Sequence, residues 1–472
     1  MNKDFIWGSA SAAYQIEGAA DAYGKGQSIW DEYSKVPGNT FKDTTGEVAI
    51  DFYHKYEEDI NLMAEMGLEA YRFSISWPRI LPNGSGEVNQ EGIDFYHKVI
   101  DLLLEKNIKP VLTIYHWDLP KALQDEYMGW EGRQIIEDFI NYCEILFKEY
   151  GSKVYHWVTL NEQNIFTTLG YVYKVHPPKV CDYQRFVNAN HIASVANAKA
   201  IKLFKDMKID GIIGASLAYS PSYAKSPNPL DVLAMENAQE LTAFFWGDVY
   251  GFGRYNAIQI KLLEQQGITI PFEEGDKEAL LNGVGDFLGL NYYTSMTASH
   301  ESEVIEQSGN TIQFAMEKDL LDNYFYRANN PHVELTDWNW IIDPQGLHVA
   351  LRRLFSRYNM PILITENGLG AYDTLEEDGS IHDQYRIDYL EAHIKAIKAA
   401  QNDGCEVLGY CTWSMQDLFS WLNGYSKRYG FVYVDRDEDS EKELKRYKKD
   451  SFYWYKKVIE ENGKNIIGGL ND

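Results

Sequence analysis

Eight short apolar runs recur along the chain, separated by longer segments whose pattern is helical. Most of the runs are nearly continuous and rich in β-branched and aromatic residues, as expected of strands that are buried on both faces. We predict strands in FIWGSA from Phe5, AYRFSIS from Ala70, KPVLTIY from Lys109, VYHWVTL from Val154, IIGASLAY from Ile212, FLGLNYY from Phe287, PILITE from Pro361 and VLGYCTW from Val407.

Amphipathic helices are predicted between these strands. One is expected from Asp51 to Met66, where Gly67 supplies a residue type that commonly follows a helix. Another is expected from Glu91 to Lys106, because its apolar residues repeat at helical spacing. Further helices are expected to start near Gln134, Tyr183, Asp231, Pro344 and Asp383.

Repeated strand–helix units predict a parallel sheet, and eight of them favour a closed (β/α)8 barrel of the α/β class. An open, doubly wound sheet is the competing interpretation. It is less favoured because no G-x-G-x-x-G motif follows the first strand. No Pro-, Gly- or Ser-rich linker divides the chain, so we expect one catalytic domain over residues 1–472.

Three long segments interrupt the alternation of strands and helices. Residues 295–342, 368–382 and 414–450 follow the sixth, seventh and eighth predicted strands, and the first of them is polar and irregular. In a barrel, the loops that follow the strands build the active-site face. We therefore expect these segments to determine substrate specificity.

The formal net charge of −26 limits the classes of binding partner. Nucleic acids and anionic membrane surfaces both require a basic patch, so neither is expected. An anionic substrate would require a local cation. Aromatic residues make up 14% of the chain. Most of them are expected in the core, although exposed rings would also suit the flat faces of sugars.

The cysteines and the N-terminal residues indicate a reducing compartment. Cys143, Cys181, Cys405 and Cys411 form no C-x-x-C pair and lie in helix-like or strand-like segments, so we expect buried free thiols. The first residues contain no long apolar stretch typical of a signal peptide, and no apolar run is long enough to span a membrane. The sequence therefore predicts a cytoplasmic protein.

Two predicted strands end in a glutamate after an apolar run: WVTLNE ends at Glu162 and ILITENG contains Glu366. Either residue alone is more often a solvated loop residue or a member of a structural ion pair. On the fourth and seventh strands of one barrel, however, the two could face each other across its mouth. Glycoside hydrolysis requires such a pair, one carboxyl group protonated and the other ionised.

The motifs around these residues resemble glycoside hydrolase family 1 along nearly the whole chain. The matching stretches are FIWGSASAAYQIEGA at 5–19, RFSISWPRILP at 72–82, YHWDLP at 115–120, TLNE at 159–162, DFLGLNYYTS at 286–295, ITENG at 364–368 and the closing run from Trp413 to Asp435. The resemblance implies a (β/α)8 barrel, a retaining mechanism, and neither a metal nor an organic cofactor.

The same resemblance implies a role for each of the strand-end residues. Glu162 would be the acid/base and Glu366 the nucleophile, which Arg72 would hold ionised. These roles require a raised pKa for Glu162 and a normal or low pKa for Glu366. Asn291 and Tyr293 would lie beside the nucleophile, and Trp413 would form the stacking floor. Gln15, His116 and Asn161 would bind sugar hydroxyls. The chain departs from the family at Gln163, where proline usually follows the acid/base.

The segment TWSMQDLFSWLNGYSKRYGF at 412–431 indicates which group the substrate carries at the sixth carbon of its sugar. Ordinary family members have a glutamate in place of Ser420, and that carboxylate would repel a 6-phosphate. Ser420, Lys427 and Tyr429 resemble the phosphate-binding residues of the 6-phospho-β-glycosidase branch. A basic surface pair with a packed tyrosine is the alternative interpretation of the last two residues.

The preference between galactosides and glucosides is less determined. Trp421 after Ser420, and the stretch TDWNWIIDPQGL at 336–347, resemble phospho-β-galactosidases. Trp338 and Trp340 of this stretch are expected at the aglycone entrance, with a place in the core as the alternative. The sequence thus favours hydrolysis of 6-phosphorylated β-galactosides, with 6-phosphorylated β-glucosides as further substrates. Lactose 6-phosphate and cellobiose 6-phosphate are examples. An ordinary β-glucosidase or β-galactosidase, and a barrel that binds sugar without catalysis, are the alternatives.

Overall fold

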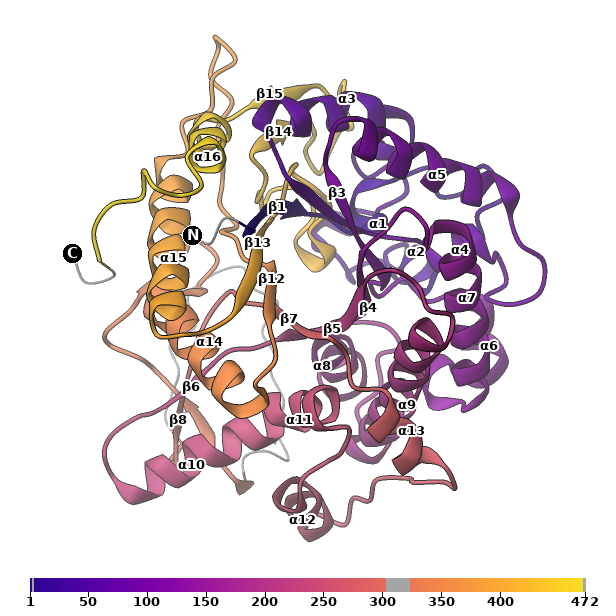
Figure 1. Cartoon of the computed structure of the whole chain (residues 1–472), viewed down its shortest axis with the longest axis vertical. Coiled ribbons are helices and arrows are strands. Elements are labelled where there is room, and N and C mark those ends of the chain that lie inside the picture. The colour runs from indigo at the N-terminus through magenta and orange to yellow at the C-terminus, as the bar shows by residue number, and fades with distance from the viewer. Residues whose placement is uncertain (2–3, 303–322, 470–472) are drawn as a thin grey trace.

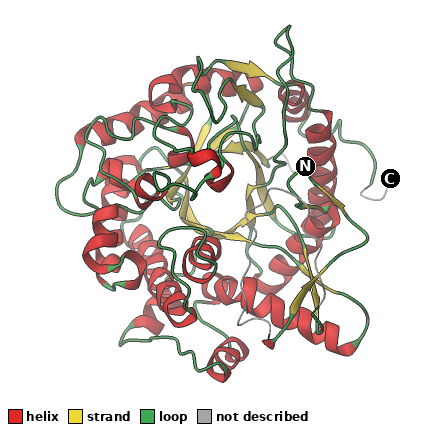
Figure 2. Ribbon diagram, turned by 180° about the vertical axis from the view of Figure 1, so that it is seen from behind, coloured by secondary structure: helices red, strands yellow, loops and turns green. Residues whose placement is uncertain are grey.

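The computed structural model describes residues 1, 4–302 and 323–469, and a closed barrel of eight parallel strands lies at its centre. Figure 2 shows the strands as a ring that is surrounded by helices. Around the barrel the strand order is β1-β13-β12-β7-β5-β4-β3-β2. The prediction of a (β/α)8 barrel is therefore confirmed, and the open-sheet alternative is wrong.

All eight predicted strands belong to the barrel. Their bounds are β1 Ile6–Ala10, β2 Ala70–Ser74, β3 Lys109–Tyr115, β4 His156–Asn161, β5 Ile212–Ala218, β7 Phe287–Asn291, β12 Ile362–Glu366 and β13 Val407–Trp413. Each strand contributes one side chain to a common apolar cluster, formed by Ile6, Ala70, Val111, Val158, Phe287 and Leu363 with Ile212 and Leu408 packed against them. Such a layer fills the barrel, as expected for this fold.

The helices cover the outside of the barrel (Figure 1). Helix α3 ends where the sequence predicts, because Gly67 adopts a left-handed conformation with φ 83° after Met66. The α-helices are α1 Ala13–Ile16, α2 Ile29–Tyr33, α3 Phe52–Met66, α4 Trp77–Ile80, α5 Gln90–Glu105, α6 Lys121–Tyr127, α7 Gln134–Tyr150, α8 Gln163–Thr167, α9 Tyr183–Asp206, α10 Pro229–Gln239, α11 Phe245–Phe252, α12 Ala257–Gln265, α13 Asp276–Asn282, α14 Pro344–Tyr358, α15 Gln384–Asn402 and α16 Asp450–Glu460.

The long loops contain more structure than their polar sequences predict. After the sixth barrel strand, β8 Met296–Ser299 pairs with β6 Ser222–Ala224 and with β9 Tyr326–Ala328, and β10 Glu334–Leu335 pairs with β11 Ile341–Ile342. After the eighth, β14 Val432–Val434 pairs with β15 Arg446–Lys448. The expectation of irregular structure over 295–342 is thus wrong for these strands, and residues 303–322 lie outside the described part.

The remaining short elements are helical turns. They are η1 Phe41–Asp43, η2 Gly129–Glu131, η3 Thr168–Val172, η4 Glu240–Phe244 and η6 Trp421–Asn423. In the described ranges no helix combines the length and the apolar character that crossing a membrane requires.

All four cysteines are free, and three of them, Cys143, Cys405 and Cys411, are buried. The prediction is wrong for Cys181, which is exposed and precedes α9 in an irregular segment. Its polar neighbours Lys179 and Asp182 are exposed as well, so this stretch lacks the apolar residues that would bury the thiol.

Candidate active site

Two buried glutamates lie at the carboxyl end of the barrel. Glu366 is the last residue of β12, and Glu162 directly follows the last residue of β4. Their exposed fractions are 3% and 6%. Glu162 adopts a left-handed conformation with φ 48°, and its N–H donates to the carbonyl of Ser216 on β5. Backbone strain of this kind is common at functional sites.

Glu366 accepts two short hydrogen bonds from Arg72 and Tyr293. The Arg72 Nη1 atom lies 2.6 Å from Glu366 Oε1, and the Tyr293 hydroxyl lies 2.7 Å from Oε2. Arg72 is fully buried and is fixed by further bonds to Thr113 and Asn161. Both groups lie where the sequence analysis expects them, and both stabilise the ionised form of Glu366.

Glu162 has a neutral partner instead of a cation. Asn291 Nδ2 donates to Glu162 Oε1 at 2.9 Å, and Thr365 orients the amide by donating to its oxygen at 2.6 Å. The sequence predicts Asn291 beside the nucleophile. The structure places it between the two carboxyl groups: it donates to Glu162, and its hydrogen bond opposes the rise in the pKa of Glu366 that burial causes.

These environments separate the protonation of the two carboxyl groups. Burial, and then the charge of Glu366, raises the pKa of Glu162 to about 8. Burial also raises the pKa of Glu366, against the expectation of a normal or low value, while Arg72 and then the Tyr293 hydroxyl oppose the shift. Since only Glu366 contacts a cation, the single negative charge of the pair resides on Glu366 at neutral pH.

Asn161 and His116 form a rigid pair next to the carboxyl groups. The Asn161 oxygen accepts from Arg72 and Asn291, so its Nδ2 atom donates to His116 Nε2 at 3.0 Å. Burial, together with the charge of Arg72, holds the pKa of His116 well below its usual value. The imidazole is therefore neutral, with its proton on Nδ1.

Gln15 presents a complementary acceptor. Its Nε2 atom donates to the carbonyl of Phe419 at 2.7 Å, while its buried Oε1 atom has no hydrogen-bond partner among the described residues. The buried Nδ1 atom of His116 likewise finds no partner in the described part of the chain. One free donor and one free acceptor on fixed side chains suit hydroxyl groups, which both donate and accept.

Aromatic rings enclose this group of polar residues. Trp413, the last residue of β13, is buried, and its ring centroid is 5.9 Å from that of His116 with an interplanar angle of 28°. Trp421 is half-buried and stacks on Tyr14 with an interplanar angle of 7°. It also lies 4.7 Å from Trp117, so it belongs to an aromatic cluster at the barrel mouth.

The structure brings Ser420, Lys427 and Tyr429 together, and all three are buried. Burial raises the pKa of the Tyr429 phenol, and a hydrogen bond with Ser420 opposes this shift. The Lys427 ammonium lies 5.6 Å from the centre of the Tyr429 ring. The alternative interpretation from the sequence is a basic pair on the protein surface. It is wrong for Lys427, whose exposed fraction is 1%.

Lys427 is a buried lysine that is bordered by aromatic rings. Its Nζ atom lies 3.7 Å from the centre of the Trp340 ring and 5.3 Å from that of Trp338. Within the described ranges no carboxylate forms an ion pair with it, and burial lowers the pKa of its amine to about 7. An unpaired buried ammonium is costly, and an anion bound beside it would stabilise its charged form.

Trp340 connects this cation to the carboxyl groups. Its ring packs edge-on against Tyr293 at 5.4 Å, and Tyr293 donates to Glu366. Trp338 stacks on Tyr372, and its buried Nε1 atom has no partner. The sequence predicts for Trp340 only a place at the aglycone entrance or in the core, because its contact with Lys427 depends on a fold that joins two distant loops.

Gln163, at which the chain departs from the family pattern next to Glu162, forms hydrogen bonds with two neighbouring helices. Its side chain donates to the carbonyl of Asn190 at 2.8 Å and accepts from the Tyr250 hydroxyl at 2.9 Å. It thereby ties the start of α8 to α9 and α11, a function that proline could not perform.

Of the described residues, no three or more His, Cys, Asp or Glu side chains form a group that could hold a metal ion.

Comparison with known proteins agrees with this arrangement. The family model "Glycosyl hydrolase family 1" matches residues 1–464. The chain is 53% identical to "Aryl-phospho-beta-D-glucosidase BglC" of Bacillus subtilis, with 98% of each chain covered, and 41% identical to "Beta-glucosidase A" of Acetivibrio thermocellus, again with 98% of each covered. The solved structure of the family 1 β-glucosidase from Thermotoga maritima superimposes with a TM-score of 0.88, at 37% identity and 98% coverage of both chains. The chain belongs to glycosyl hydrolase family 1 and is a glycoside hydrolase.

Proposed function

We propose that the protein is a retaining 6-phospho-β-glycosidase. The observation that carries this proposal is the buried, unpaired ammonium of Lys427, which lies beside Tyr429 and one aromatic ring away from Tyr293. A dianionic phosphate would supply the missing counter-charge. The hydroxyl groups of Ser420 and Tyr429 would add directional donors to its oxygens.

Glu162 and Glu366 would divide the two chemical roles. Glu162, with its raised pKa, would donate a proton to the departing glycosidic oxygen while the Glu366 carboxylate attacks the anomeric carbon. The C–O bond to the aglycone breaks as the covalent glycosyl–enzyme bond forms. Esterification removes the charge of Glu366, so the pKa of Glu162 falls and it can deprotonate the water that releases the sugar.

The neighbouring residues would bind the sugar that carries the phosphate. Asn161, held between Arg72 and His116, would contact the 2-hydroxyl, a contact that strengthens in the transition state. The free atoms of Gln15 and His116 would bind other hydroxyls, and Trp413 would stack against the ring. Trp338 would line the entrance for the aglycone.

The named relatives support the phosphorylated substrate but include other activities. Two further relatives, both from Bacillus subtilis, are named aryl-phospho-β-D-glucosidases, and one from Clostridium longisporum is named a 6-phospho-β-glucosidase. Other relatives, 41% and 39% identical to the chain, are named β-glucosidases without mention of a phosphate. We therefore propose 6-phosphorylated β-glucosides as the first substrates to test, with the galactosides that the sequence favours as the second.

A four-substrate assay tests the proposal. Hydrolysis of nitrophenyl β-glucoside and β-galactoside would be measured with and without a 6-phosphate, and the anomer released first would be identified by NMR. We expect faster turnover of a phosphorylated substrate and release of the β-anomer. Equal or faster turnover of both neutral sugars would contradict the 6-phospho proposal and favour an ordinary glycosidase.

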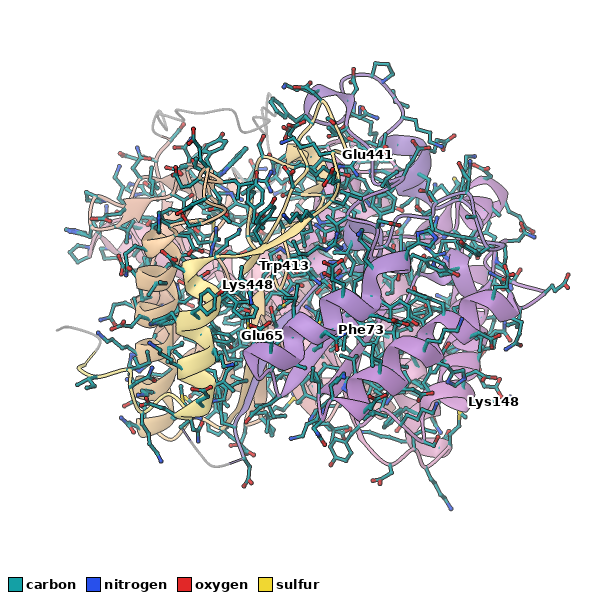
Figure 3. The ribbon with its side chains drawn as sticks, turned by 90° about the horizontal axis from the view of Figure 1, so that it is seen from above. Glu65, Phe73, Lys148, Trp413, Glu441 and Lys448 are labelled. Atoms are coloured by element: carbon teal, nitrogen blue, oxygen red, sulfur yellow. The ribbon has the colours of Figure 1, made fainter. Side chains whose placement is uncertain are left out.

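A substitution assigns this preference to one cation. Lys427→Ala should raise KM for the phosphorylated substrate roughly 10- to 100-fold, the value of a charge-assisted hydrogen bond, and leave the neutral substrate unchanged. The matched control is Lys448→Ala. Lys448 pairs with Glu65 on the outer surface, where both are labelled in Figure 3, and its loss should change neither substrate.

A further inference from the structure

Gly370 borders the Lys427 side chain at a distance that leaves no room for a β-carbon. A Cβ atom placed on Gly370 would lie 2.6 Å from Lys427 Cε, 2.9 Å from Lys427 Cγ and 3.0 Å from Tyr429 Cζ. The φ angle of Gly370 is not in the left-handed region, so its backbone does not require glycine. The requirement for glycine at this position is therefore spatial.

The backbone around Gly370 cannot move away from Lys427. The N–H of Ala371 donates to the carbonyl of Arg428 at 2.9 Å, and the N–H of Arg428 donates back to Ala371 at 3.0 Å. The buried guanidinium of Arg386 holds the carbonyl of Leu369 at 2.5 Å. Hydrogen bonds on both sides of Gly370 thus fix its distance from the segment that carries Lys427.

That segment is itself anchored on its opposite face. Arg428 points away from the site and forms a buried ion pair with Asp417 at 2.9 Å. Lys449 contacts Asp417 at 2.7 Å, so the carboxylate joins two cations below the segment. Because neighbouring residues of an extended chain face opposite sides, this anchor places Lys427 and Tyr429 towards the site.

Three aromatic rings border the Lys427 side chain. Trp340 lies 3.7 Å from its ammonium, Trp338 lies 5.3 Å away, and Tyr429 lies on a third side at 5.6 Å. Gly370 closes the side along the aliphatic stem. Any added side chain at position 370 would push the stem against these rings.

We propose that Gly370 is a specificity-determining residue: its missing side chain creates the space in which Lys427 points its ammonium at the 6-phosphate. The proposal rests on the proposed function. Gly370 is a positioning residue, because it acts through Lys427 and contacts no substrate atom. A side chain at position 370 would convert the site from one that favours phosphorylated sugars into one that does not.

The test is a double-mutant cycle of Gly370→Ala and Lys427→Ala. Gly370→Ala should raise KM for nitrophenyl β-glucoside 6-phosphate roughly tenfold or more, with kcat and the neutral glucoside little changed. In the Lys427→Ala background the same substitution should have a much smaller effect, because the Cγ and Cε atoms that make the two shortest contacts with the new methyl group are gone and only the 3.0 Å contact with Tyr429 Cζ remains. Melting temperatures follow the same cycle. Gly370→Ala should lower the melting temperature when Lys427 is present and should lower it much less in the Lys427→Ala background. This comparison remains informative even if the Gly370→Ala single variant folds poorly.

Three outcomes overturn the inference. The first is an unchanged KM for the phosphorylated substrate in Gly370→Ala. The second is an equal loss on both substrates, which would indicate damage near Glu366 instead. The third is an effect that persists fully in the Lys427→Ala background. Failure of the proposed function is recognised separately, since then neither the wild-type chain nor Lys427→Ala would distinguish phosphorylated from neutral substrates, and the inference falls with it.

Discussion

The preference for a phosphorylated substrate should depend on pH through Lys427. Burial lowers the pKa of its amine from 10.5 to about 7, so the ammonium is present below this pH and is lost above it. An ordinary lysine would keep its charge to about pH 10. The ratio of kcat/KM for phosphorylated over neutral substrate should therefore fall about tenfold for each pH unit above about 7, or about 100-fold by pH 9.

Because the measured quantity is a ratio of two kcat/KM values, titrations that affect both substrates equally cancel. The pKa of Glu162 is raised to about 8, so its deprotonation slows both substrates at alkaline pH and cancels in the ratio. The second pKa of a phosphate monoester is about 6, which leaves the substrate dianionic over the range of interest. The assay is initial-rate hydrolysis of the two nitrophenyl glucosides between pH 6.5 and 9.5, with each sample brought to one alkaline pH before nitrophenolate is read.

Two results would refute this reasoning. A constant ratio up to pH 9.5 would mean that the Lys427 ammonium is as stable as an exposed one, despite its burial among aromatic rings. A slope that persists in Lys427→Ala would assign the titration to another group. Burial raises the pKa of the neighbouring phenols Tyr293 and Tyr429 above their usual range, which excludes them as the source.

Three further predictions concern the carboxyl groups and the packing beneath them. Glu366→Ala should abolish turnover of every substrate, whereas Glu162→Gln should slow glycosides with poor leaving groups far more than nitrophenyl glycosides, because a good leaving group needs less protonation; equal effects on both leaving groups would contradict the assignment. Gln163→Leu should lower the free energy of unfolding by about 2–3 kcal/mol in a denaturant titration, since Asn190 and Tyr250 lose buried partners, and an unchanged midpoint would count against this. Asp417→Asn should lower the free energy of unfolding by about 3–5 kcal/mol, because Arg428 loses its carboxylate partner and Lys449 keeps only Asp373, while Asp439→Asn, which affects a surface pair with Lys42, should leave unfolding unchanged.

The barrel strands were predictable because burial on both faces leaves an unambiguous pattern. KPVLTIY and VLGYCTW coincide with β3 and β13 residue for residue. The strands of the long loops were missed because they have two to four residues, too few to show a period. Their pairing is set by the position of the barrel strands that precede them.

The strand-end residues could be grouped from the sequence because a barrel brings the carboxyl ends of its strands together. The hydrogen-bond partners of each carboxyl group could not be predicted in the same way. Whether Asn291 contacts Glu162 or Glu366 depends on a side-chain rotation that Thr365 controls through one hydrogen bond. The contact of Gly370 with Lys427 joins residues that are far apart in the chain, and glycine leaves no side chain whose pattern could indicate it.

The charge of the whole chain and the charge of the site act at different ranges. A net charge of −26 repels a dianion at a distance, but physiological salt screens this repulsion beyond about 8 Å. Affinity for a sugar phosphate must then come from contact and not from steering. The buried ion pairs on the opposite face of the Lys427 segment join Arg428 and Lys449 to Asp373 and Asp417, so these charges compete little for the ligand. Among the described residues no carboxylate pairs with Lys427, and in the proposed site a phosphate would supply this missing counter-charge, which would make binding selective by contact.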